Sequence, residues 1–400
     1  MDRRRVLAVV AVAELLAMSL WFSATAVGPE LADAWGLSAG QVGWLTTAVQ
    51  VGFVAGALAS SAVTLSDMVP PRYLFSASAA AGAVCTALLA GVESVGPAVA
   101  LRFLTGVALA GVYPPGMKIL AGWFDTGRGL AIGVLVGALS VGSALPHLLR
   151  GVGGVGRPRL VLYGAAVLAT LGGVLVLFAR PGPHQSPTAP FDPRAISRLL
   201  ADRPSMLANG GYFGHMWELY AVWTWMPAYL LASFTASGAV GDPATAAALA
   251  TFGMIAAGGA GAALAGPLAD RYGRTPVTVV SLAASASACL GAGVVFGRSP
   301  LVVVPFVLAW GVVVVADSAQ FSAAVSELAE GSYVGTALTL QTAIGFLLTT
   351  VSIQLLPTVA DAVGWQWAFA PLAIGPFLGG LSMLRLRTLP AARKLAGGRG

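Results

Sequence analysis

The chain has 400 residues, of which 57% are hydrophobic and only 10% are charged. Soluble proteins carry about 25% charged residues, so this composition excludes a water-soluble globular protein and makes lipid the main solvent. The net charge of +6 does not indicate a nucleic-acid partner, because the basic residues collect in alternate loops, as a membrane topology requires.

Twelve hydrophobic blocks follow one another along the chain. A spanning helix needs roughly 20 apolar residues, and each block is about that long. Strands of a membrane barrel would instead alternate over about 10 residues. The blocks therefore predict an all-α polytopic membrane protein with twelve transmembrane helices. They lie at 6–27, 41–64, 73–92, 96–117, 129–150, 160–179, 206–231, 245–268, 276–296, 301–322, 333–356 and 366–386.

A proline-rich, charged segment near the middle of the chain interrupts this pattern, and the sequence repeats across it. Glu14 and Trp21 in the first block return as Glu218 and Trp225 in the seventh, with the same Leu and Ala between them. Two pairs recur at nearly the same displacement: Gly106 with Gly311, and Cys85 with Cys289. Such repetition is typical of transporters built from two parallel repeats. We therefore expect a six-helix bundle at 1–179, a linker at 180–204, a second six-helix bundle at 205–390 and a tail at 391–400.

The distribution of arginine predicts which side of the membrane each loop faces. Arginines precede the first block, at Arg3 to Arg5, and they crowd the 180–204 linker and the tail. Cytoplasmic loops are enriched in Lys and Arg, so both termini and the linker should be cytoplasmic, with the protein in the inner (cytoplasmic) membrane. A basic cluster at 150–159 is the exception, because it falls on the opposite side.

Short motifs resemble those of one transporter family. Residues 266–274 read G-P-L-A-D-R-Y-G-R, which matches the G-x-L-x-D-R-x-G-R loop of the major facilitator superfamily. The first-half counterpart of this loop keeps Asp67 and Arg72. Arg102 and Gly106 are similar to the R-x-x-x-G motif of proton-coupled members. The chain is therefore similar to this superfamily over nearly its whole length.

This resemblance carries expectations about fold and function. Around 113–129 and 317–322 the chain looks most like the prokaryotic nitrate/nitrite and cyanate porters, although the arginines of the nitrate porters in helices two and eight are absent. The resemblance implies the major facilitator fold, alternating access, and transport of a small organic or inorganic anion together with protons. It also implies a cytoplasmic gate at Asp67, Arg72, Asp270, Arg271 and Arg274.

Ionisable residues inside membrane spans are costly, and they usually face the interior of the bundle and mark the transport path. Here they fall in helices one, four, seven and ten, which line the central cavity in the resembled fold. We expect proton coupling by Glu14, His215, Glu218 and Asp317. His215 and Glu218 lie one helical turn apart and form a candidate proton relay, because imidazole titrates near neutral pH.

The expected substrate contacts combine the intramembrane arginine with aromatic and amide side chains. They are Arg102, Trp21, Tyr113, Trp217, Trp225 and Gln320. Structural roles stay open for all these groups. Intramembrane carboxylates can hydrogen-bond across helices, Arg102 can cap backbone carbonyls near the kink at Pro114 and Pro115, and tryptophans commonly anchor helices at the membrane interface.

These residues predict a proton-coupled secondary active transporter that moves a small solute, an anion, by alternating access. Two alternatives stay open. Three carboxylates outnumber the one arginine, which suits a proton antiporter that exports cationic or amphipathic compounds; a membrane-embedded enzyme or sensor would use His147 or His215. The sequence has no G-K-[ST] phosphate loop and its histidines are scattered, so we expect no enzyme activity, no cofactor and no metal site. The expected partners are the solute, protons and the lipid bilayer, with the chain as a monomer.

Overall fold

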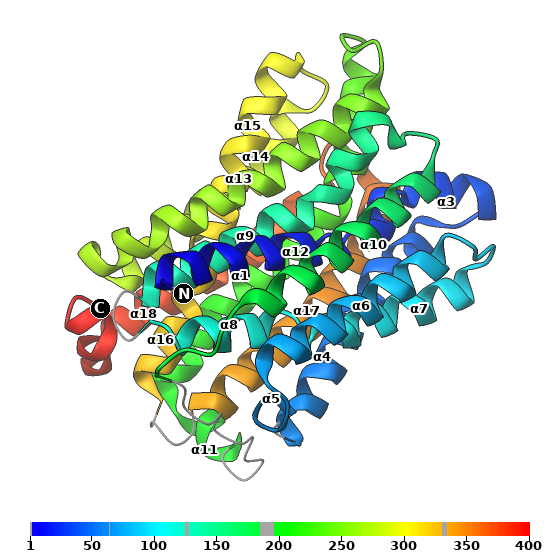
Figure 1. The fold of residues 1–400 in the computed structure, drawn as a ribbon. Coiled ribbons are helices and arrows are strands. Elements are labelled where there is room, and N and C mark those ends of the chain that lie inside the picture. The colour runs from blue at the N-terminus through cyan, green and yellow to red at the C-terminus, as the bar shows by residue number, and fades with distance from the viewer. Residues whose placement is uncertain (1, 64, 125–127, 185–195, 330–333) are drawn as a thin grey trace.

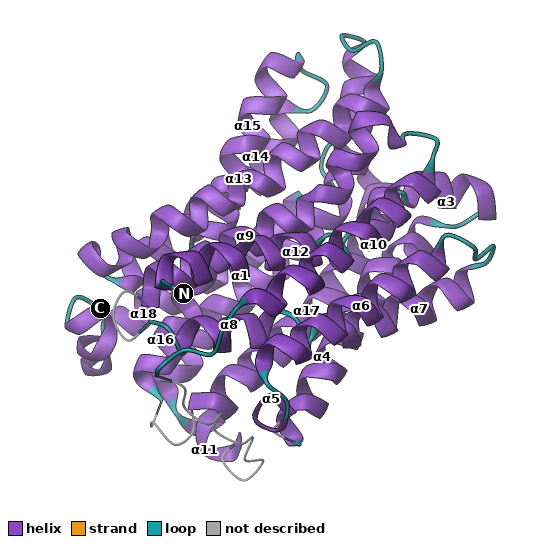
Figure 2. Ribbon diagram, in the orientation of Figure 1, coloured by secondary structure: helices purple, strands orange, loops and turns teal. Residues whose placement is uncertain are grey.

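The computed structural model describes residues 2–63, 65–124, 128–184, 196–329 and 334–400. Within these ranges the regular structure is helical and contains no strand (Figure 2). Figure 1 shows both chain termini at one end of the molecule and α3 (Gly28–Trp35) at the other. We call these two ends the terminal end and the far end.

The first half of the chain runs back and forth between the two ends, and two of its passages are broken. The first passage is interrupted between α1 and α2, and the fourth between α7 and α8. Pro114 and Pro115 lie in the first turn of α8, where proline is tolerated because its missing N–H would have no partner. The elements are α1 (Arg3–Met18), α2 (Ser23–Ala26), α3, α4 (Ala39–Ala62), α5 (Leu65–Met68), α6 (Pro71–Leu89), α7 (Val95–Leu109), α8 (Tyr113–Ala121), α9 (Arg128–Leu149), η1 (Arg150–Gly154), α10 (Pro158–Leu175) and η2 (Val176–Phe178).

The second half follows the same path with different breaks. Its tenth passage is interrupted at Asp317, between α15 and α16, as the fourth passage is between α7 and α8. The seventh passage differs from the first, because α12 is one unbroken helix of 35 residues. The elements are α11 (Ile196–Ala201), α12 (Arg203–Ser237), α13 (Pro243–Tyr272), α14 (Arg274–Val295), α15 (Pro300–Ala316), α16 (Ser318–Leu328), α17 (Val334–Val363), η5 (Ala370–Ala373), α18 (Ile374–Arg387) and η6 (Pro390–Gly397).

Nine helical stretches in the described ranges are long and apolar enough to cross a membrane. The predicted first, seventh and twelfth spans are not among them. The first is divided after Met18, α12 carries polar residues such as Asn209 and Glu218, and α18 has only 14 residues. Every predicted block nevertheless contains helix, as the predicted all-α architecture requires.

Glycines permit the same helix crossing in both halves. A Cβ atom at Gly106 of α7 would lie 2.1 Å from the Val49 carbonyl oxygen of α4, and one at Gly311 of α15 would lie 1.9 Å from the Met254 carbonyl oxygen of α13. Backbones approach this closely only where no side chain intervenes, as small residues allow in membranes. Gly106 and Gly311 are matching positions of the sequence repeat, so the repeat extends to helix packing.

The two halves meet along two helix pairs, α9 with α13 and α4 with α17. Gly137 of α9 and Gly259 of α13 face each other, because a Cβ at either one would come within 3.2 Å of the carbonyl oxygen of the other. At the far end, the Gln354 amide of α17 hydrogen-bonds Thr47 Oγ1 of α4 at 3.2 Å and packs on Gly43. The far end is thus held closed by contacts between the halves.

The predicted linker and tail are both at the terminal end. Residues 185–195 of the linker lie outside the described ranges, and α11 forms part of the remainder. The tail includes most of η6, where the Ala396 N–H donates to Glu327 Oε2 of α16 at 3.0 Å. The tail therefore packs on the second half. The domain boundaries at 179 and 205 stay a prediction.

Candidate functional site at the helix breaks

Arg102 of α7 is fully buried and fills the break between α1 and α2. Its Nε donates to the Leu45 carbonyl oxygen at 3.2 Å, and its Nη1 donates to the Leu20 carbonyl oxygen at 3.0 Å and to Ser23 Oγ at 3.1 Å. Its Nη2 donates to the Trp21 carbonyl oxygen. Carbonyl oxygens at a helix end lack partners within the helix, so the guanidinium supplies the donors that the break removes.

This arrangement leaves Arg102 little capacity for a substrate. Arginine has five N–H donors, and the bonds to the break and to α4 use most of them. The structural role considered above, a cap for backbone carbonyls, therefore matches the contacts of Arg102. The capped carbonyls, however, lie at another break than expected. Arg102 caps the break in the first passage, whereas the kink expected near Pro114 and Pro115 lies between α7 and α8.

Glu14 of α1 is fully buried, and neither of its carboxyl oxygens has a hydrogen-bond partner within the described ranges. Its Oε2 lies against the backbone of α8, because a Cβ at Gly116 would be only 3.0 Å away. Tyr113 lies one helical turn before Gly116 on α8 and is partly buried. Glu14 therefore faces the fourth passage of its own half, and its hydrogen-bonding capacity is unused.

Glu218, the repeat partner of Glu14, has donors on two helices of the second half. Ser285 Oγ of α14 donates to Glu218 Oε1 at 2.5 Å, and Trp310 Nε1 of α15 donates to the same oxygen at 2.9 Å. Cys289 Sγ lies 3.4 Å from it. Glu218 thus connects α12 to α14 and α15 inside one half.

His215 pairs with a residue on another helix, and not with Glu218. Its Nδ1 lies 2.9 Å from Asp317 Oδ1, and both side chains are buried. The rings of Phe321 and Tyr212 flank the imidazole, with centroids 5.7 Å and 6.2 Å away. The expected His215–Glu218 relay stays a prediction: in this structure the imidazole turns toward the break at Asp317, while Glu218 faces α14 and α15.

Six buried aromatic side chains join the two halves, and we call them the aromatic cluster. They are Trp21, Phe22, Phe53, Tyr220, Trp223 and Phe346. The Trp21 ring lies 5.2 Å from Phe53 in its own half, and 5.7 Å from Tyr220 and 5.6 Å from Phe346 in the other. These are typical distances for packed aromatic pairs. Among the predicted substrate residues, only Trp21 belongs to the cluster; Phe22, Phe53 and Phe346 are missed by sequence reasoning, because rings in apolar spans carry no distinguishing pattern.

The family model of the Major Facilitator Superfamily matches residues 10–240, more than half of the chain. The chain belongs to the Major Facilitator Superfamily. A search of curated proteins finds no significant match.

Solved structures of other Major Facilitator transporters share the fold. The nucleoside transporter NupG is 13% identical with a TM-score of 0.73, and the match covers 96% of this chain and 99% of NupG. A bacterial homolog of the human lysosomal transporter Spinster is 14% identical with a TM-score of 0.72, covering 97% of each chain. The xylose transporter XylE from E. coli is 14% identical with a TM-score of 0.74, covering 96% of this chain and 97% of XylE. At these identities the likeness concerns the fold alone.

The Major Facilitator loop motif of the second half is tied to the tenth passage. Arg274 Nε donates to both carboxyl oxygens of Glu327 at 2.9 and 3.0 Å, and its Nη1 lies 3.8 Å from Asp270 Oδ1. The Arg271 guanidinium lies over the ring of Tyr272. The motif therefore anchors α14 to α16 within one half.

The first-half counterpart of this motif is less connected. Arg72 lies over the Tyr73 ring and donates to its hydroxyl at 3.0 Å, on an exposed surface. The side chain of Asp67 lies outside the described part of the structure. The cytoplasmic gate at these five residues stays a prediction.

Three of the predicted substrate residues do not contact Trp21 in the part of the chain that the structure describes, and each makes a different contact elsewhere. Trp225 Nε1 donates to the Ile353 carbonyl oxygen at 2.9 Å. Trp217 packs on Gly375 of α18, where a Cβ would be 2.5 Å from the indole. Gln320 Oε1 accepts from Arg274 Nη1 at 2.8 Å. The structure therefore does not bring the six predicted substrate residues into one site.

The basic cluster at 150–159 has a structural explanation in part. Arg150 is buried, and its Nε donates to Glu30 Oε1 of α3 at 3.0 Å. The Gly156 N–H donates to the same oxygen at 3.3 Å. Arg150 therefore has a structural role, because it ties the end of the fifth passage to α3.

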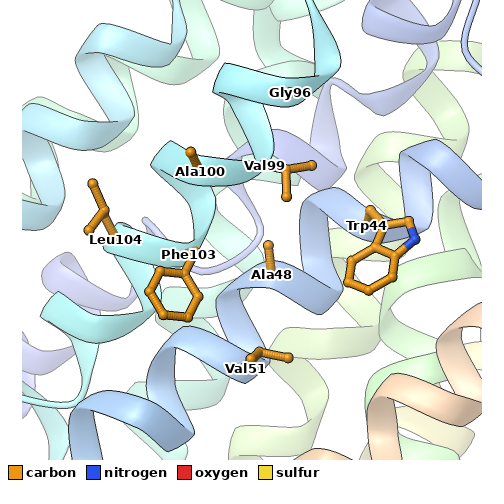
Figure 3. Close-up of a pocket in the computed structure, with 8 residues that line it drawn as sticks. All are labelled: Trp44, Ala48, Val51, Gly96, Val99, Ala100, Phe103 and Leu104. Atoms are coloured by element: carbon orange, nitrogen blue, oxygen red, sulfur yellow. The ribbon is translucent and has the colours of Figure 1, made fainter.

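A hollow of about 470 Å³ lies between α4 and α7 (Figure 3). Its lining is apolar and includes Trp44 and Leu104, which are 47% and 49% exposed. Exposed apolar side chains on transmembrane helices face lipid, as the expected bilayer partner requires. This hollow is therefore a poor candidate for a site that recognises a polar solute.

Proposed function

We propose that this Major Facilitator protein is a proton-coupled secondary active transporter, which moves a small solute across the cytoplasmic membrane by alternating access. Family membership and the two-half fold support a secondary transporter, because such folds bind solute between the halves and rock about that site. The contacts that close the far end are those that one half would break when it rocks against the other.

Glu14 is the observation that carries proton coupling. A buried carboxylate without a partner is costly, and either protonation or contact with water removes that cost. A conformation that wets Glu14 therefore differs in proton affinity from one that buries it. A proton shifts the conformational equilibrium only through such a difference. The buried His215–Asp317 pair, at the break of the tenth passage, offers a second titratable site of a different kind, because its two groups contact each other.

The charge of the solute separates the two transport hypotheses. The resemblance implies an anion, but a buried anion needs a cation, and Arg102 is bound to backbone carbonyls. This observation weakens the anion version. Export of amphipathic compounds gains support from the aromatic cluster, because its buried rings offer an apolar surface between the halves.

An enzyme or sensor gains no support. Neither ring nitrogen of His147 has a partner within the described ranges, and His215 is paired with Asp317. The same ranges hold no group of three His, Cys, Asp or Glu side chains that could bind a metal.

Flux into proteoliposomes with and without a proton gradient tests the proposal. We expect solute to accumulate against its gradient when protons flow inward, and the accumulation to stop when an ionophore removes the gradient. Efflux driven by inward protons identifies an exporter. Equal flux with and without the gradient contradicts proton coupling.

Orientation in the membrane has its own test. The arginine distribution supports cytoplasmic termini. In a background without Cys85 and Cys289, we expect Ser197→Cys, in the linker, to react with an impermeant thiol reagent only in broken cells. Gly241→Cys, between α12 and α13, should react in intact cells. Labelling of both from outside contradicts the twelve-helix topology.

A further inference from the structure

The aromatic cluster includes hydrogen-bonding groups that the protein itself leaves unused. Trp21 Nε1 and Trp223 Nε1 are buried and have no partner within the described ranges. The same is true of both polar atoms of the Gln50 amide on α4. Such orphaned groups are rare in folded proteins and call for an explanation, such as a bound molecule.

The register of α4 places Gln50 beside the cluster. Thr46, four residues before Gln50, shares a hydrogen bond of 2.6 Å with Thr25 of α2. Phe53, three residues after it, packs on Trp21 at 5.2 Å. Residues at these spacings share one face of a helix, so the Gln50 amide lies between two contacts with the first passage.

From these groups we propose that the aromatic cluster and Gln50 bind an uncharged planar ring that carries hydrogen-bond acceptors and a donor. When the halves part, the cluster rings stack on the faces of the solute instead of on one another, as aromatic side chains do with planar heterocycles. The two indole N–H groups and the Gln50 NH₂ donate to its acceptors, and Gln50 Oε1 accepts from its donor.

Charged solutes fit this set of groups less well. None of the cation–π contacts in the described ranges involves a cluster ring, and the Arg102 guanidinium hydrogen-bonds the backbone carbonyl of Trp21. A buried anion would lack a counter-ion, and a buried cation would meet N–H donors pointing at it. This inference rests on the proposed transport function and specifies its solute class.

Three ring compounds that differ in charge test the solute class. Nicotinamide is uncharged, nicotinate carries a carboxylate, and 1-methylnicotinamide is a cation; uracil and adenine add two further uncharged rings. We expect at least one uncharged compound, at millimolar concentration, to raise the melting temperature of the full chain in lipid nanodiscs by about 2 °C or more. The charged compounds, nicotinate and 1-methylnicotinamide, should raise the melting temperature less. Stabilisation by the charged compounds alone, or by none of the five, overturns the inference.

Two substitutions test the named contacts. Trp21→Phe keeps a ring and removes the N–H, and Gln50→Leu keeps the approximate volume and removes the amide; each should weaken binding about tenfold, as the loss of a buried hydrogen bond predicts. The matched controls are Trp44→Phe, whose indole is on the lipid-facing surface, and Gln366→Leu, whose amide donates to the Gly293 carbonyl oxygen. Both controls should bind as wild type.

Unchanged affinity in Trp21→Phe and Gln50→Leu means that water satisfies these groups, and it overturns the inference. Flux measurements separate this failure from failure of the proposed function. Proton-driven accumulation of nicotinate, unaffected by the two variants, contradicts the solute class and leaves the transporter intact. Binding of an uncharged ring without accumulation under a proton gradient contradicts coupled transport and leaves the binding site intact.

Discussion

Glu14 and Glu218 occupy matching positions of the sequence repeat, yet their surroundings differ. Glu218 accepts hydrogen bonds from Ser285, Trp310 and Cys289, whereas Glu14 has no partner within the described ranges. The first passage is broken and held by Arg102, whereas α12 continues unbroken through the matching stretch. The two repeats thus share their helix packing, although the glutamates at the matching positions have different surroundings. Glu218 is placed to hold three helices together, and Glu14 to change its protonation.

The largest effect should follow from replacing Arg102, the buried arginine that holds the break of the first passage. Arg102→Met removes the hydrogen bonds that the guanidinium donates to the carbonyl oxygens of Leu20, Trp21 and Leu45. Hydrogen bonds to charged groups contribute about 1.5–3 kcal/mol each, so the melting temperature in detergent should fall by about 5 °C or more. Arg102→Lys should rescue little, because a single ammonium cannot reach acceptors on two helices. The exposed Arg159→Met is the control, and stability equal to it would show that the break does not depend on Arg102.

A smaller loss of stability, equal in the two halves, is expected at the helix crossing that the halves share. Gly106→Ala and Gly311→Ala each place a methyl group against the backbone of the facing helix. Overpacking costs about 1–3 kcal/mol, and thermal unfolding should show both variants destabilised to a similar degree. Gly96→Ala, where a Cβ would meet open space, is the control. Loss of stability in only one of the two variants would show that the two matching helix crossings do not contribute equally to stability.

The smallest effect should appear in the coupling between His215 and Asp317. A double-mutant cycle with His215→Gln and Asp317→Asn should give a coupling energy of about 1 kcal/mol, because the two groups are in contact. The same cycle between His215→Gln and Glu218→Gln should be nearly additive. Strong coupling in the second cycle would instead support the relay between His215 and Glu218 that the sequence suggests.

Hydropathy predicts the helices, because span length is a local property, and the repeat pairs Gly106 with Gly311. The helix crossing that these two glycines share is visible only in the structure. The partners of Glu14 and Glu218 are not predictable in this way, since they depend on how each helix is rotated toward its neighbours. Arg102 shows the same limit: the sequence suggests that it caps carbonyls, but the break it caps lies on another helix. Gln50 carries no charge, so the high cost of burying an ionisable group does not mark it. An uncharged amide in an apolar span is the signal that identifies it.

Proton-driven accumulation by Glu14→Gln and Glu218→Gln in proteoliposomes tests the central claim most directly. Glutamine keeps the shape and hydrogen-bonding capacity of glutamate but cannot bind or release a proton. Glu14→Gln should lose uphill transport across pH 5.5 to 8 on the order of tenfold or more, while energy-independent exchange continues. Glu218→Gln should lose stability and keep a larger share of its coupling, because Ser285 and Trp310 already engage its oxygen. Wild-type accumulation by Glu14→Gln at every pH would contradict the account and return Glu14 to a structural role between α1 and α8.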